Sequence, residues 1–165
     1  MKLKIALLVN LLLVGMLAGL HFGGMVYYNS GLDTLPQTAL ITSQQHIEKA
    51  FAPSIAWLFV VTTLSALPVI YFAWKSKSRL LPYLLIGGVC VAAGLISTLI
   101  VNVPINNDML KWSAVNPPSD WLTVRHRWDV YNDFRTVMFA LGFITILAGT
   151  IFVLPEKTKT SRKSR

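Results

Sequence analysis

The stretch Phe51–Val103 reads FAPSIAWLFVVTTLSALPVIYFAW, then KSKSR, then LLPYLLIGGVCVAAGLISTLIVNV. Each of its two apolar runs is long enough to cross a hydrocarbon core as a helix, which takes about 20 residues. Lipid satisfies no backbone polar group, so runs of this length without alternation must be helical. The short basic turn KSKSR between them is typical of a cytoplasmic connection. The stretch therefore predicts a helical hairpin in a membrane.

Two further apolar runs lie on either side of this hairpin, and together the four predict an all-α fold. We expect a transmembrane antiparallel four-helix bundle, with helices over about residues 5–28, 51–74, 80–103 and 120–154. A length of 165 residues favours one domain, here residues 1–155, followed by a basic cytoplasmic tail over 156–165. In the loop between the first two spans we expect an interfacial helix capped by Thr42 or Ser43.

Composition supports a membrane protein and argues against a nucleic-acid partner. Charged residues make up 13% of the chain, about half the share in a soluble domain, and the mean hydropathy is +0.57. The formal charge is +8, but ten of the fifteen Lys and Arg residues lie in three short flanks, which is a topology signal. We therefore expect both termini in the cytoplasm and the lipid bilayer of the cell membrane as partner. These flanking residues are Lys2, Lys4, Lys75, Lys77, Arg79, Lys157, Lys159, Arg162, Lys163 and Arg165.

Two of the predicted helices carry stripes of small residues, which let another backbone approach closely. The first helix has glycine at positions 15, 19 and 23, and the third has Gly87, Cys90, Gly94 and Ser97 at spacings of three and four. We favour packing within the bundle as their use and keep a homodimer through the glycine stripes as the alternative.

A stripe of large polar and aromatic residues opens the fourth helix, after the helix-start signal Pro117-Pro118-Ser119-Asp120. Its members recur at spacings of four, three, four and three, so that all fall within an arc of about 80°. Polar groups inside a spanning segment are costly and are functional candidates by default. Three residues of the other helices, His21, Asn102 and Asn106, fall at the same depth, which predicts one outward-facing pocket. The stripe consists of Trp121, Arg125, Trp128, Asn132 and Arg135.

Each of these residues also has a purely structural interpretation. The tryptophans could form an interfacial aromatic belt, Arg125 could pair with Asp129, and Arg135 could extend its charge to the membrane surface. His21 could bond to a backbone carbonyl. A metal site built from His21, His46 and His126 is not favoured, because no metal-binding spacing links them. We predict neither a metal nor another cofactor.

The residues of the third and fourth helices resemble those of a known family. The pattern is Asn102-Val-Pro-Ile-Asn106-Asn107, then Trp112, then Trp121-x3-Arg125-x2-Trp128-x3-Asn132-x2-Arg135-Thr136. It is similar to the anthrone-oxygenase-like family of small four-helix membrane proteins, which are mostly bacterial and mostly of unknown function. The resemblance covers nearly the whole chain. It implies that Asn102, Asn106, Arg125, Trp128, Asn132 and Arg135 match the family motif.

Characterised members of that family oxidise an anthrone to an anthraquinone with molecular oxygen, without a recognised cofactor. An enzyme of this kind has to remove a proton and stabilise the resulting anion. His21 could act as the base, Arg135 with Asn102 and Asn132 could hold the oxyanion, and Trp121 and Trp128 could stack a flat aromatic ligand. The alternative is a non-catalytic membrane module that uses the same pocket to bind a lipid, a quinone or a partner membrane protein. Whether the chain is an enzyme stays open at this point.

Overall fold

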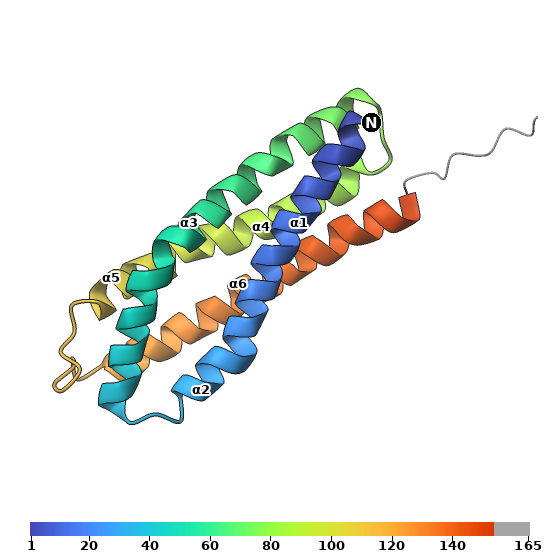
Figure 1. The fold of residues 1–165 in the computed structure, drawn as a ribbon. Coiled ribbons are helices and arrows are strands. Elements are labelled where there is room, and N and C mark those ends of the chain that lie inside the picture. Colours follow the sequence, from blue (N-terminus) through green and yellow to red (C-terminus); the bar gives the residue numbers. More distant parts are fainter. Residues whose placement is uncertain (154–165) are drawn as a thin grey trace, which may run out of the picture.

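A computed structural model describes residues 1–153, which form four long helical spans. Figure 1 shows these helices packed lengthwise into a bundle. The basic tail over 156–165 and the predicted helix end at Leu154 lie outside the described residues. The elements in chain order are α1 (Lys2–Gly23), the π-helical segment η1 (Gly24–Asn29), α2 (Ser30–Leu32), α3 (Gln37–Lys75), α4 (Leu81–Ser97), the π-helical segment η2 (Thr98–Asn102), α5 (Val103–Met109) and α6 (Trp121–Val153).

These elements join into four continuous helical spans, which confirms the predicted all-helical membrane bundle. The spans are Lys2–Leu32, Gln37–Lys75, Leu81–Met109 and Trp121–Val153, and each is long and apolar enough to cross a membrane. Their outward faces carry large apolar side chains; Trp57 and Val89, for example, are 70% and 69% exposed. Side chains of this kind at such exposure need lipid as their solvent.

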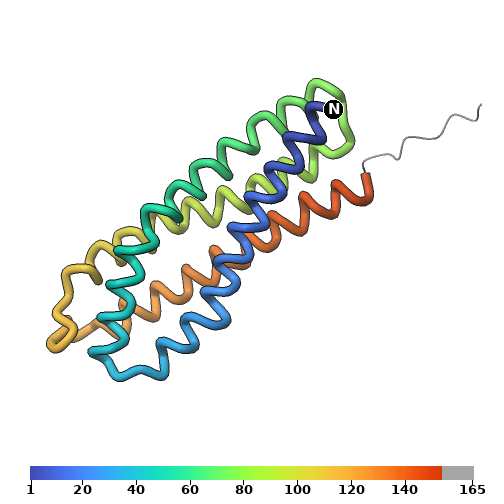
Figure 2. Tube along the Cα trace, in the orientation of Figure 1, coloured from blue at the N-terminus to red at the C-terminus, as the bar shows by residue number. Residues whose placement is uncertain are grey.

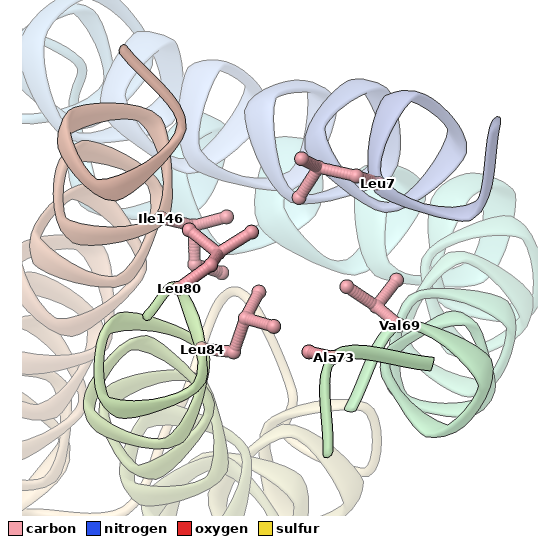
Figure 3. Packing of buried hydrophobic residues seen from close by; sticks show 6 residues of the cluster. All are labelled: Leu7, Val69, Ala73, Leu80, Leu84 and Ile146. Carbon is pink, nitrogen blue, oxygen red and sulfur yellow. The ribbon is translucent and has the colours of Figure 1, made fainter. Parts of the chain in front are cut away.

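Figure 2 shows that the N-terminus, the turn between α3 and α4 and the end of α6 lie at one end of the bundle. This end carries Lys2, Lys75 and Arg79, so the positive flanks within the described residues are gathered there. The α3–α4 turn is tight, because the amide of Ser78 donates to the carbonyl of Ala73 at 2.9 Å and Lys77 between them adopts a φ of 49°. The apolar core at this end, drawn in Figure 3, is a cluster of aliphatic side chains: Leu7, Val69, Ala73, Leu80, Leu84 and Ile146.

The second span differs from the prediction and begins fourteen residues earlier than the expected 51–74. Thr42 and Ser43 do not cap a separate helix, because α3 is continuous from Gln37 and its N-cap is Pro36, with a ψ of 148°. A proline with extended ψ is a natural helix start. Residues 37–50 contain neither glycine nor proline to interrupt the helix. The added turns matter because they bring Gln44 and Glu48 into the spanning helix α3.

Close packing between α4 and α6 uses the small-residue stripe of α4. A Cβ on Gly87 would lie 2.6 Å from Ile146, and one on Gly94 would lie 2.6 Å from the Phe139 ring. This stripe therefore serves packing within the bundle. In the α1 stripe only Gly15 has a close neighbour, Phe143 at 3.0 Å, whereas a Cβ on Gly19 or Gly23 would meet no described atom within 4 Å. A homodimer through this stripe stays a prediction.

Candidate functional site

Arg135 lies inside the bundle, with 8% of its surface exposed, rather than reaching toward the membrane surface. One terminal nitrogen, Nη1, donates to the Thr98 hydroxyl at 3.3 Å, and the other, Nη2, donates to the side-chain oxygen of Asn132. Both partners are neutral, and no carboxylate of residues 1–153 lies within 4 Å of the guanidinium. The third donor, Nε, is buried and has no hydrogen-bond partner in this part of the chain.

Asn102 supplies an unpaired acceptor to the same cluster. Its side chain is fully buried, and its Nδ2 donates to the backbone carbonyl of Trp128 at 3.1 Å. Its Oδ1 has no partner among the described residues. Asn102 ends the π-helical segment η2, and π turns inside α-helices occur frequently at functional sites. Buried polar atoms are normally paired, so an open donor and an open acceptor in one polar cluster suggest a place for a ligand.

Trp128 and Asn106 join α6 to α5 beside this cluster. The indole Nε1 of Trp128 donates to Asn106 Oδ1 at 2.5 Å. The ring is half-buried and packs against Val101, Ile105 and Met109. The Trp128 N–H is thus already bonded, and its ring already contacts this apolar cluster. Trp128 is therefore better placed to position the two asparagines than to stack on a ligand.

His21 lies on α1 with its ring against two phenylalanines. The ring centroids are 5.0 Å from Phe139 and 5.6 Å from Phe59. Its Nδ1 is 2.8 Å from the Leu17 carbonyl, as the structural interpretation expected. A carbonyl can only accept, so Nδ1 carries the proton and Nε2 is the basic nitrogen of the neutral ring. The backbone oxygen of His21 accepts from Thr136 at 3.5 Å, and Thr136 follows Arg135 directly. The structure thus brings His21 to the Arg135 layer.

Arg125 lies two to three turns nearer the start of α6, and all of its nitrogens are occupied. Its Nη1 donates to Gln44 Oε1 at 2.7 Å, its Nη2 to Asp33 Oδ1 at 2.8 Å, and its Nε lies 3.6 Å from Asp129 Oδ2. The expected pair with Asp129 is therefore present, together with two stronger partners. Trp121 packs in the same layer against Leu32, Leu40 and Ile41. These two members of the stripe tie the ends of α3 and α6 together.

One cavity of the bundle lies away from this cluster. It measures about 120 Å³, and its lining includes none of the eight predicted site residues. A second space of about 10 Å³ touches Trp121 and Arg125 but is too small for a ligand. The residues at the Arg135 level form a buried polar cluster, and the outward-facing pocket stays a prediction.

Several residues of the cluster escaped the sequence analysis. Gln44 and Asp33, which hold Arg125, come from the region taken as a loop. Glu48 lies on the same helical face as Gln44, near the side chain of Asn106 and within electrostatic range of Arg135. The spacing of four between Gln44 and Glu48 would have indicated this face if the second span had been predicted to begin at Gln37.

The three histidines do not come together. His46 and His126 are exposed whereas His21 is buried, and residues 1–153 contain no group of three His, Cys, Asp or Glu side chains arranged to hold a metal ion.

Comparison with known proteins gives one match. Residues 42–145, well over half of the chain, match the family model described as Anthrone oxygenase. No curated protein matches significantly, and no solved structure does either. The matched region contains the whole polar stripe of α6 together with Asn102, Asn106 and Gln44, the α3 residue that accepts from Arg125. The chain belongs to the anthrone oxygenase family.

Proposed function

We propose that the protein is a membrane-embedded oxygenase that uses molecular oxygen to convert an anthrone-like polycyclic phenol into the corresponding quinone. The observation that carries the proposal is the pair of open polar atoms, Arg135 Nε and Asn102 Oδ1, in a buried cluster that also contains His21. The family match supports the reaction class.

The chemistry needs a base and an anion site. The methylene group of an anthrone is acidic because its carbanion is delocalised onto the carbonyl oxygen. In our scheme Nε2 of His21 accepts this proton, and the Nε–H of Arg135 donates to the oxyanion that forms. A preorganised donor in a low-dielectric site stabilises such a charge far more than water-exposed donors do.

Oxygen then adds to the carbanion carbon and forms a C–O bond. The proton held by His21 moves to the outer oxygen of this peroxide and gives a hydroperoxide. The second C–H bond and the O–O bond then break as the C=O bond forms. The released proton joins the departing hydroxide, which leaves as water. The methylene carbon gives up four electrons, and both atoms of oxygen are reduced. One oxygen atom ends in the quinone and the other in water, so that atoms and electrons balance.

Oxygen consumption by the purified protein tests the proposal. With a model anthrone in detergent, we expect uptake above the autoxidation background, with one atom of ¹⁸O₂ in the quinone. Arg135→Ala should lower the rate at least about a hundredfold, the effect of losing one preorganised donor to an oxyanion. Lys111→Ala changes an exposed side chain that pairs with the exposed Asp108, so it serves as the control and should keep full activity. A folded Arg135→Ala protein with wild-type uptake would sink the scheme.

One observation favours a non-catalytic alternative. The cavity of about 120 Å³ is separate from the Arg135 cluster, as expected if the chain binds a small apolar molecule without transforming it. A lipid, a quinone or a partner membrane protein would then be the ligand. Uptake at background for the wild type and Arg135→Ala alike, together with retained ligand binding at the cavity, would favour this second function.

A further inference from the structure

A lateral cavity lies among α1, α3 and α4, with Ile146 of α6 also in its lining. Its volume is about 120 Å³ and its walls are mostly aliphatic. Three of the residues that line it, Thr63, Ala92 and Ile96, are exposed on the outer surface of the bundle. The cavity therefore reaches the face of the bundle that contacts lipid, between α3 and α4.

Thr62 is the unusual residue of this cavity. Its side chain is 1% exposed and lines the cavity, yet its hydroxyl has no hydrogen-bond partner among residues 1–153. Helical threonines commonly donate to the carbonyl four residues earlier. Other threonines of the bundle do so, at 2.7 to 2.9 Å: Thr63, Thr98, Thr136 and Thr150. Leaving a buried hydroxyl unpaired costs free energy, so Thr62 is a candidate for contact with a ligand.

Asn10 brings a second polar group to the same cavity. It is 2% exposed, and its Nδ2 donates to the Ser65 hydroxyl at 2.8 Å. Ser65 in turn donates to the Thr62 carbonyl at 2.7 Å. These two bonds fix the amide, and the Asn10 oxygen is left as an acceptor in an otherwise apolar cavity. Most small-molecule sites have this composition, with apolar walls and few placed polar groups.

We propose that this cavity binds the head ring of a lipophilic one-ring quinone that enters from the bilayer between α3 and α4. A cavity of about 150 Å³ holds a benzene molecule, so this volume suits a single ring and is too small for a three-ring anthrone. A quinone carbonyl would accept from the Thr62 hydroxyl, and the Asn10 amide oxygen would accept from the hydroxyl of the reduced form. An acyl chain would fill the space but leave Thr62 unpaired. The site is separate from the Arg135 cluster and does not depend on the proposed oxygenase activity.

The test is a binding titration of a benzoquinone with a decyl tail on the full-length protein in nanodiscs, followed by calorimetry. Thr62→Val removes the hydroxyl and keeps the shape, and it should weaken binding about tenfold, the value of one hydrogen bond. Thr63→Val is the matched control, because its hydroxyl is already bonded to Phe59, and it should bind like the wild type. Gly88→Leu should abolish binding, since Gly88 lines the cavity and a Cβ there has open space.

The ligand-free variants provide a second readout. If the Thr62 hydroxyl is unpaired until a ligand binds, Thr62→Val should raise the melting temperature of the ligand-free protein. The same substitution should remove the increase in melting temperature that the quinone gives the wild type. Equal quinone affinity in the wild type and Thr62→Val would overturn the proposal. The proposal would also be overturned if decane bound as tightly as the quinone and Thr62→Val weakened the binding of neither ligand. That result would identify an acyl-chain site.

Discussion

Two arginines lie ten residues apart along α6, and both are more than nine-tenths buried: Arg125 is 4% exposed and Arg135 is 8% exposed. Arg125 meets two carboxylates and one amide oxygen, so each of its nitrogens has a partner. Arg135 meets a hydroxyl and an amide, and its Nε has no partner in the described part of the chain. Burial alone therefore does not distinguish the two arginines, whereas their hydrogen-bond and ion-pair partners do.

The end of the bundle that holds the N-terminus and the end of α6 provides a second contrast. Its core is the aliphatic cluster of Figure 3, which includes Leu7, Leu80 and Ile146 and no charged side chain. The same four spans thus build an apolar core at one end and bury two guanidinium groups toward the other. Burying a charge is expensive unless it is paired. Arg125 has carboxylate partners that offset this cost, whereas no carboxylate of residues 1–153 pairs with Arg135. This difference is what the proposed anion site at Arg135 would require.

The largest stability effect should come from Arg125. Arg125→Ala leaves Asp33, Asp129 and Gln44 without their partner, and breaking a buried pair costs about 3–5 kcal/mol. Since the Asp33 side chain is 61% exposed, we expect a smaller loss, about 2–3 kcal/mol. Arg135→Met should change stability by less than about 1 kcal/mol, because it removes a charge that has no carboxylate partner. Reversible unfolding in SDS would measure both, and an equal loss in the two variants would erase the distinction between the two arginines.

Removing one partner of Arg125 tests the same distinction between the two arginines, with about half the expected loss of stability. Gln44→Met keeps the length of the side chain but removes the oxygen that accepts from Arg125 at 2.7 Å. Hydrogen bonds to charged groups contribute about 1.5–3 kcal/mol, so unfolding should be easier by about 1–2 kcal/mol, while oxygen uptake per folded molecule stays unchanged. A large loss of uptake at wild-type stability would instead place Gln44, and the Arg125 layer with it, in the reaction.

The sequence predicted the α6 stripe well because its information is local. Spacings of three and four fix which residues share a helix face, and Arg125, Asn132 and Arg135 are all buried as expected. The partners of the stripe were harder to predict. Gln44 and Glu48 belong to a spanning helix because α3 begins at Gln37, after its N-cap Pro36. The predicted second span began only at Phe51, after a separate interfacial helix capped by Thr42 or Ser43.

Helical periodicity could predict neither the different partners of the two arginines nor the lateral cavity. Asp33 lies 92 residues from Arg125 along the chain, and nothing in the α6 stripe states which guanidinium it will meet. The unpaired hydroxyl of Thr62 likewise follows from where α1, α3 and α4 leave space between them. Such features depend on packing of distant segments, whereas helix length and face depend on neighbours within one or two turns.

The smallest expected effect on stability concerns another cation–carboxylate pair, one that is exposed rather than buried. Lys111 donates to Asp108 at 3.1 Å, with the two side chains 75% and 67% exposed. Exposed pairs contribute about 0–1 kcal/mol, so Lys111→Ala should change the free energy of unfolding by less than about 0.5 kcal/mol. The comparison with Arg125→Ala holds the charge type constant and varies burial and the number of partners. If Lys111→Ala were as destabilising as Arg125→Ala in the same SDS unfolding assay, the strength of the Arg125 layer could not be attributed to its buried, fully partnered guanidinium.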